Sequence, residues 1–356
     1  MKATLTKSNE SERRRDAFSL ILAVLPFLFS GANADPVAKS ASVEEYYQAQ
    51  DAGDFGLTFN RALATGGTVL ASCRTYNIAT TIRYRFHGQI LEGCGNGYST
   101  DAGRTVLIWK GVMGGKVVSF ASVPGTGGVS NAQLRDLDID GSNTAGIGVE
   151  VYDNDARAGG GNWRNSLSHV TIRNVSGGQS PRAIELGHTN TAPNFANDFV
   201  GYSVAVFNSE IGVWLNGSTE TFYSSTIGFN AKYGFRIETG GNLQLHSSIC
   251  QNNGIDISGH NPGNIAILGG SFQDSSRGII ILDRGTTQNS LVIIGAYLHT
   301  SSKNQMFDFA AAAGAVAILG SFVPVDAASR TVAGVNPTYS FSMVGTTGLT
   351  DPVVKH

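Results

Sequence analysis

The sequence predicts an all-β chain built as a β-solenoid, in which short parallel strands stack coil upon coil. One phrase, Gly-apolar-x-apolar, recurs and begins at Gly212, Gly234, Gly254 and Gly278. The glycines are 22, 20 and 24 residues apart, which is too short for a strand-helix-strand unit of about 30 residues and long enough for one coil. A second apolar run precedes most of these phrases, as at residues 243–245.

Alternation along each strand predicts which side chains face the interior. Successive side chains point to opposite faces, so the two apolar residues of each phrase should be interior and the residue between them exterior. The predicted exterior column is Glu150, Glu185, Trp214, Arg236, Asp256 and Ile280. The predicted interior residues are Val213, Leu215, Phe235, Ile237, Ile255, Ile257, Ile279 and Ile281. Asn230 and Asn252 are predicted as turn residues whose amides bond to neighbouring coils.

Composition agrees with many tight turns between short strands. The 356 residues include 45 glycines and 9 prolines, against a usual glycine content of about 7%. The formal net charge is -2, and the Lys/Arg residues form no run outside the first residues of the chain. These features argue against a nucleic-acid partner.

The first 34 residues have the pattern of a signal peptide. Arg13, Arg14 and Arg15 precede an apolar core at 18–29, and a small-residue cleavage site at 32–34 follows. Twelve apolar residues are too few for a membrane-spanning helix, which needs about 20. We therefore expect a protein exported to the periplasm or beyond the cell, with no membrane span after cleavage and with the export route left open.

The rest of the chain divides into three predicted parts. Residues 35–66 form an amino-terminal segment with a short capping helix, whose apolar side is Leu57, Ala62 and Leu63. Residues 67–313 form the solenoid. Residues 314–356 lose the repeat and are predicted to close the carboxyl end, either as a cap or as an oligomer contact.

Three cysteines allow at most one disulfide within the chain. Cys73 and Cys94 lie 21 residues apart in the first coil and could pair in an oxidising compartment. Cys250 lies in a predicted strand, and we expect it to be a buried thiol. The sequence leaves the pairing of Cys73 and Cys94 open.

The first coils resemble those of a known superfamily. Residues 51–56 and the helix after them, together with 67–70, 75–78 and 91–95, resemble the entry of the pectate-lyase-like right-handed parallel β-helices, which include phage tailspikes, polygalacturonases and pectate lyases. The resemblance covers about residues 51–310 and implies a right-handed parallel β-helix acting on or binding glycans. The usual acidic pair before the capping helix is missing, and the polygalacturonase signatures are absent.

Carboxylates on the exterior column are the predicted catalytic groups. Cleavage of a glycosidic bond needs a proton donor and a second carboxylate as base or nucleophile. Glu150 and Glu185 meet that need, and Asp256 is a third candidate. In adjacent coils the two glutamates stand about 5 Å apart, the separation associated with retention. The 35-residue interval between them also allows an intervening coil. The simpler alternative to a catalytic pair is that both glutamates lie on a solvated surface.

Four other residues are predicted to bind substrate. An outward Trp214 offers a face on which sugar rings stack, unless a long loop covers it. Arg236 could hold an acidic sugar's carboxylate, or form an ion pair with Asp256. His188 and Glu238 lie beside the same strands.

A rival site is the face of Asp136, Asp138 and Asp140, followed by His169 in the next coil. Three alternating carboxylates could bind calcium, as the resemblance to pectate lyases implies, although a solvated strand face is the simpler alternative. The sequence otherwise predicts no metal or cofactor.

These observations favour a secreted glycoside hydrolase that acts inside a polysaccharide chain through paired carboxylates. One alternative is a polyuronate lyase that cleaves by β-elimination, and another is a non-catalytic glycan-binding or surface-attachment protein. The sequence identifies neither the sugar nor the oligomeric state.

Overall fold

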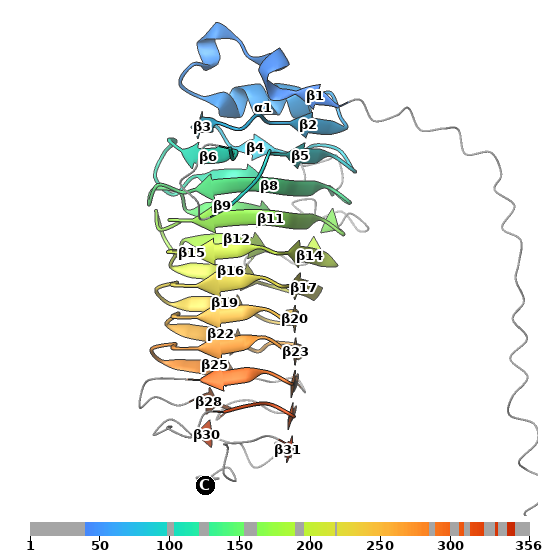
Figure 1. Cartoon of the computed structure of the whole chain (residues 1–356), viewed down its shortest axis with the longest axis vertical. Helices are drawn as coiled ribbons and strands as arrows, with labels where there is room; N and C mark the ends of the chain where they lie inside the picture. Colours follow the sequence, from blue (N-terminus) through green and yellow to red (C-terminus); the bar gives the residue numbers. More distant parts are fainter. Residues whose placement is uncertain are drawn as a thin grey trace, which may run out of the picture. The chain divides into compact units, whose positions relative to one another are not determined.

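The chain folds as a right-handed parallel β-helix, which confirms the predicted fold class. The computed structural model describes residues 40–97, 103–120, 128–152, 162–188, 196–217, 219–284, 289–299, 306–309, 314–323, 332–333 and 340–345. Figure 1 shows these coils stacked along one axis, from α1 at one end to β31 at the other. The predicted signal peptide lies outside the described residues.

Two long parallel sheets form the walls of the helix. The ten-stranded sheet consists of β4 (Ile82–Arg83), β7 (Lys116–Ser119), β9 (Ile147–Val151), β12 (Arg182–Leu186), β16 (Ile211–Leu215), β19 (Tyr233–Ile237), β22 (Ile255–His260), β25 (Gly278–Arg284), β28 (Phe307–Asp308) and β30 (Val332–Ala333). The nineteen-stranded sheet consists of β1 (Ala41–Ser42), β2 (Thr68–Leu70), β3 (Thr75–Ile78), β5 (Ile90–Glu92), β6 (Val106–Trp109), β8 (Gln133–Asp140), β11 (Ser166–Arg173), β14 (Phe199–Tyr202), β15 (Ala205–Phe207), β17 (Thr219–Tyr223), β18 (Thr226–Gly228), β20 (Asn242–His246), β21 (Ile249–Gln251), β23 (Ile265–Leu268), β24 (Ser271–Gln273), β26 (Asn289–Ile294), β27 (Tyr297–His299), β29 (Gly314–Leu319) and β31 (Ser340–Val344). A separate pair consists of β10 (Asn162–Trp163) and β13 (Ala196–Asn197).

Each regular coil contributes one strand to the first sheet and two to the second, as β16, β17 and β18 do. The two strands of the larger sheet are separated by a corner where the backbone is left-handed, with φ of 49° at Ser203, 47° at Ser224 and 48° at Ser247. Side chains other than glycine rarely adopt this region. Small polar residues here let the chain turn within two residues and keep successive coils in register.

The interior is a continuous apolar core, and most of the predicted register is confirmed. Val213, Leu215, Phe235, Ile237, Ile255, Ile257 and Ile279 are all buried. The prediction for the coil of β25 was wrong, because Ile280 stacks on Ile257 and is fully buried while Ile281 stacks on Ser258 and is half-buried. The Gly-apolar-x-apolar phrase that begins at Gly278 is shifted by one residue relative to the phrase of β22, because Gly278 pairs with Ile255.

Buried polar side chains bond one coil to the next at the second corner. The Oδ1 atom of Asn230 accepts a hydrogen bond from the backbone N–H of Ser209 (3.1 Å), and its Nδ2 donates to Oδ1 of Asn253 (3.0 Å). The predicted role of Asn230 is therefore confirmed. In the next coil the ladder residue is Asn253, while Asn252 takes the left-handed turn with φ of 52°.

The amino-terminal end is closed by two short 3-10 helices, η1 (Val43–Tyr46) and η2 (Ala49–Asp51), and by helix α1 (Phe55–Leu63). The helix begins because the Asp54 side chain accepts the backbone N–H of Gly56 (2.9 Å). Phe59, Ala62 and Leu63 are buried on the first coil, as a cap requires. Leu57, which the sequence placed on the apolar side, is exposed.

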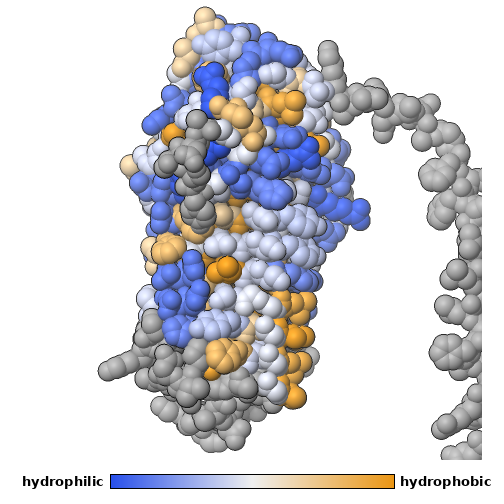
Figure 2. Space-filling view, in the orientation of Figure 1, coloured by the Kyte–Doolittle hydropathy of each residue, from blue (hydrophilic) through white to orange (hydrophobic). Residues whose placement is uncertain are grey.

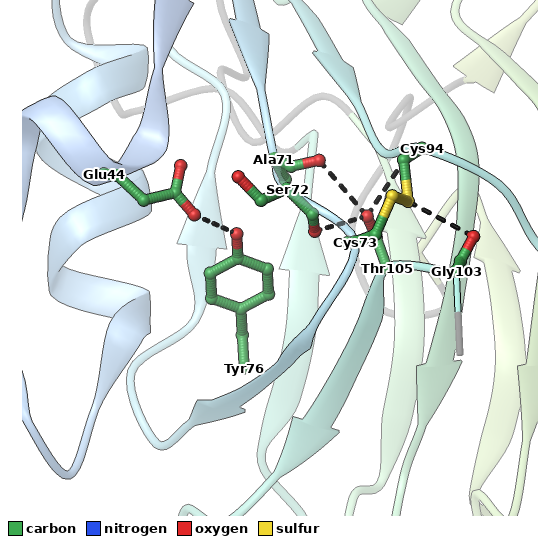
Figure 3. Close-up of a disulfide and its surroundings, with 8 residues drawn as sticks. All are labelled: Glu44, Ala71, Ser72, Cys73, Tyr76, Cys94, Gly103 and Thr105. Atoms are coloured by element: carbon green, nitrogen blue, oxygen red, sulfur yellow. Dashed lines mark hydrogen bonds between the residues drawn. A yellow bond between two sulfur atoms is a disulfide. The ribbon is translucent and has the colours of Figure 1, made fainter.

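The Cys73–Cys94 disulfide is formed and joins the segments that follow β2 and β5, which pair in adjacent coils. Figure 3 shows Thr105 beside it. The Thr105 Oγ1 accepts from the backbone N–H of Cys94 (3.0 Å) and donates to the carbonyl of Ser72 (2.9 Å). Cys250 is a buried thiol, as predicted, and burial raises its pKa. The disulfide thus stabilises the first coils, where the stack has fewer neighbours.

Coil pairing continues beyond the predicted end of the solenoid at residue 313. Strand β29 pairs with β26 along six residues, and β31 pairs with β29 along five. The sequence of β29 is Gly-Ala-Val-Ala-Ile-Leu, in which alanines replace the larger outward residues and the repeated phrase is lost. In the part of the chain that the structure describes, no helix is long and apolar enough to cross a membrane.

Candidate functional site

The exterior column is present on the ten-stranded sheet, although its later members differ from those predicted. Cα pairing places Glu150 beside Glu185, Glu185 beside Trp214, and Trp214 beside Arg236. No coil intervenes between the two glutamates. From β7 to β28 the column is Ser119, Glu150, Glu185, Trp214, Arg236, Ser258, Ile281 and Asp308.

Asp256 does not belong to this column, and its predicted position was wrong. The pairing of Phe235 with Ile257 places Ser258 next to Arg236 and leaves Asp256 fully buried at the corner. A shift of two residues keeps the alternation of faces, so the apolar pattern alone does not detect it. The Oδ1 of Asp256 accepts from Nδ2 of Asn253 (2.8 Å) and from the hydroxyl of Ser275 (2.5 Å).

Burial raises the pKa of Asp256 to about 7, against the opposing effect of the Ser275 and Asn253 hydrogen bonds. The folded state therefore holds this proton more tightly than the unfolded state, whose pKa is near 3.8. Stability from this group is present at low pH and is lost as the pH rises from about 4 to about 7, by roughly 4 kcal/mol in total.

We expect Asp256→Asn to remove this pH dependence and to be more stable than the parent at pH 8. Thermal unfolding of both proteins at pH 5 and pH 8 measures the difference. The same change in melting temperature between the two pH values in parent and variant would show that Asp256 does not titrate as described.

Each glutamate of the column is buried and held by a cation. Glu150 pairs with Nζ of Lys116, from the strand before it. Glu185 accepts from Nη2 of Arg182 (2.7 Å) and lies 3.1 Å from Nδ1 of His188. Both glutamates are 1% exposed, so the alternative of a solvated carboxylate surface is wrong. Burial lowers the pKa of Lys116, but the charges of Glu150 and Glu185 outweigh it and the pKa is raised.

The accessible part of the site consists of Lys116 and His188, whose side chains are each 33% exposed. Between them lies Tyr152, with the ring of His188 stacked on it (4.9 Å between centroids) and Nζ of Lys116 5.5 Å from its centroid. The backbone carbonyl of His188 accepts from Nδ2 of Asn216 (2.8 Å), which fixes this residue to the next coil. Burial and the nearby Glu150 raise the pKa of Tyr152.

Trp214 is half-buried, with the Arg182 guanidinium 4.3 Å from its ring centroid. Its Nε1 is buried and has no hydrogen-bond partner among the residues that the structure describes. One coil on, Nε of Arg236 donates to Glu238 (2.9 Å) and Nη1 donates to the hydroxyl of Ser258 (2.6 Å). The predicted ion pair of Arg236 with Asp256 is therefore replaced by one with Glu238.

The rival aspartate face is not a single cluster. The left-handed φ of 57° at Asp136 breaks the alternation, so the three carboxylates separate. Asp136 lies 3.4 Å from His169, Asp138 is buried against Arg104 (2.8 Å), and Asp140 pairs with Arg173 (3.1 Å). Among the described residues no three His, Cys, Asp or Glu side chains are grouped as metal ligands, and calcium remains a prediction.

Sequence reasoning did not find Lys116, Tyr152 or Arg182. Lys116 lies in a coil whose phrase is irregular, and Tyr152 follows directly after the Glu150 strand. Arg182 begins the strand of Glu185, and an Arg three residues before an outward Glu is a detectable signal for a local ion pair. The candidate site therefore combines Glu150, Glu185, Trp214 and Arg236 of the exterior column with His188 and with these three residues, which the sequence did not predict.

Solved structures share this fold, whereas no protein-family model and no curated protein matches the sequence. The mannuronan C-5 epimerase A-module of Azotobacter vinelandii is 17% identical with a TM-score of 0.56, covering 86% of this chain and 98% of that one. The tailspike protein of an Acinetobacter phage (12%, TM-score 0.60, 87% of this chain) and tailspike protein 2 of bacteriophage CBA120 (12%, TM-score 0.61, 86%) are also similar. This chain spans 60% and 47% of those two tailspike chains. The likeness shows the parallel β-helix fold.

Proposed function

We propose that this chain is an exported enzyme that acts on an acidic polysaccharide, removes the hydrogen beside a uronate carboxylate and cleaves the chain by β-elimination. The observation that carries the proposal is the cluster of His188, Tyr152 and Lys116 over the buried Glu185. Export rests on the signal peptide predicted at residues 1–34.

β-Elimination at this carbon needs three kinds of group, and the site offers candidates for each. A cation must offset the charge that develops on the uronate carboxylate, and Lys116 and Arg182 are the candidates. A base must accept the hydrogen, and an acid must protonate the leaving oxygen. The accessible imidazole and the phenol beside it are residues of the type that performs these roles.

His188 is the proposed base, because a carboxylate orients its ring. With Nδ1 donating to Oε1 of Glu185 (3.1 Å), Nε2 is left to accept a proton. Tyr152 is the proposed acid, since a phenol is protonated at neutral pH at its ordinary pKa of about 10 and the pKa of Tyr152 is raised further. The C-5–H bond breaks towards Nε2 and its electron pair is delocalised into the uronate carboxylate. The pair then forms the C-4=C-5 double bond as the C-4–O bond breaks, and the leaving oxygen takes the proton of Tyr152.

The name of one structural neighbour supports chemistry at the same carbon. It is a mannuronan C-5 epimerase, and C-5 carries the hydrogen next to the carboxylate in a uronate. Epimerisation and β-elimination both begin with loss of this hydrogen and differ in whether the oxygen at C-4 leaves.

Hydrolysis by the Glu150 and Glu185 pair is the second candidate, favoured by their Cα pairing in adjacent coils. It ranks lower because both carboxylates are 1% exposed and each is bound to a cation. Lys116 and His188, whose side chains are each 33% exposed, are the more accessible groups of the site.

A panel of neutral and acidic polysaccharides tests the proposal, with reducing ends and ultraviolet absorbance followed together, in calcium and in chelator. We expect new reducing ends and an unsaturated, absorbing product from a polyuronate alone. Reducing ends without absorbance would support hydrolysis instead. Binding without any product would support the third alternative, a glycan-binding protein.

Trp214→Ala should chiefly weaken substrate binding. Loss of one stacking contact costs roughly 1 to 3 kcal/mol by analogy with base-aromatic stacking, so affinity should fall about five- to 150-fold. Titration of an unreactive oligosaccharide measures the loss. Trp163→Ala, which removes an exposed indole outside the column, is the matched control. Equal affinities for parent and Trp214→Ala would exclude Trp214 from the binding surface.

A further inference from the structure

The outer face of the larger sheet changes character along the axis of the solenoid. Over the first coils it carries ion pairs, such as Glu92 with Arg135 (2.6 Å) and Asp140 with Arg173 (3.1 Å). From β14 onwards the outward residues of β14, β17, β20, β23, β26, β29 and β31 include no Asp, Glu, Lys or Arg among those the structure describes. We call this surface the uncharged face. The single acidic residue of these strands, Glu220, is buried.

One column runs through every strand of the uncharged face and is apolar or aromatic throughout. Its members stack by direct Cα pairing and are Tyr202, Tyr223, His246, Leu268, Ile294, Leu319 and Val344. The first three rings are stacked, at 5.0 Å and 4.6 Å between centroids. Figure 2 shows apolar surface gathered on the right, over the later coils, along the edge where Figure 1 labels β20, β23 and β31.

Four members of this column are exposed to solvent. Tyr202, Leu268, Ile294 and Val344 are 48%, 37%, 42% and 62% exposed. Single exposed apolar residues are normal, but a contiguous row marks a contact surface. Depletion of charge combined with aromatic and aliphatic enrichment is the signature of the buried part of a protein-protein interface.

The size and periodicity of the face fit a second copy of this chain. Seven strands spaced about 4.8 Å apart and about five residues long give a footprint of roughly 500 Å². Two copies would bury about 1,000 Å², which is the lower bound for a specific interface. A face with no charge has no means of attracting a charged partner, whereas another copy presents the same row of side chains at the same spacing.

We propose that the uncharged face is the contact through which copies of this chain associate. This surface lies on the sheet wall along β14 to β31, and so differs from a contact confined to residues 314–356. Neither the exterior column nor its cations take part, so association and turnover are separable properties.

Light scattering on the full chain at about 10 µM tests the proposal, with a mass of at least twice 37.4 kDa expected. Ile294→Arg and, separately, Leu268→Glu place opposite charges on exposed positions of the column. Each should weaken association at least tenfold. Ser166→Arg, on the outward side of β11 before the uncharged face begins, should keep the parent mass. Circular dichroism checks that each variant is folded. If Ile294→Arg does not fold, Ile294→Gln is used in its place.

Three results would overturn the proposal. The first is a monomer at every concentration up to about 100 µM. The second is an oligomer that survives both charge variants, which would locate the contact elsewhere. The third is a monomeric parent whose polysaccharide binding is weakened by Ile294→Arg, which would assign the face to a glycan.

Discussion

Replacing Glu185 with Gln is expected to lower turnover on a polyuronate by about a hundredfold or more, the scale of a lost acid-base contribution, while substrate binding is retained. The carboxylate accepts from Arg182 and orients His188 through Nδ1. A carboxamide has the same shape, but its NH2 group can face Nδ1 and favour the wrong tautomer of the imidazole. Steady-state kinetics and oligosaccharide titration measure the two properties separately.

Glu92→Gln is the matched control, because Glu92 also pairs with an arginine but lies on the other sheet. It should keep parental turnover. If an active preparation keeps full turnover after Glu185→Gln, the exterior column is not the catalytic site. The face of Asp136 to Asp140 then becomes the next candidate.

Replacing Ile257 with Asp is expected to prevent soluble expression. Ile257 is fully buried between Phe235 and Ile280 of the neighbouring coils. An aspartate there buries a carboxylate without a partner, at a cost of several kcal/mol, which is a large part of the stability of a typical domain. Expression yield and thermal unfolding measure the effect.

Ser166→Asp, an outward substitution of the same kind on β11, should express normally. Soluble Ile257→Asp protein with an unchanged melting temperature would contradict the interior assignment of this residue.

The sequence predicted the fold because a solenoid repeats one local pattern. Each Gly-apolar-x-apolar phrase placed two apolar residues inside, and Val213, Leu215, Phe235 and Ile237 are buried as that rule requires. The rule fails where pairing slips, since two residues of shift preserve the alternation. Asp256 was therefore given the place that Ser258 occupies.

The candidate site was predicted less completely, because it depends on side chains from irregular segments. Stacking in register brought Glu150, Glu185, Trp214 and Arg236 together, as the repeat implied. The residues that pair with these glutamates and change their chemistry lie outside the Gly-apolar-x-apolar phrase. Lys116 and Tyr152 became visible only when the coils were stacked, and they convert an apparent carboxylate pair into a buried support for an accessible imidazole, with the buried phenol of Tyr152 beside it.

The most direct test of the proposed chemistry is proton NMR in D2O on a polyuronate oligosaccharide incubated with the parent protein and with His188→Gln. We expect the parent to remove the signal of the hydrogen at C-5, by elimination or by exchange, and His188→Gln to do so at least a hundredfold more slowly. Cleavage of the oligosaccharide with the C-5 signal intact would contradict the proposed chemistry.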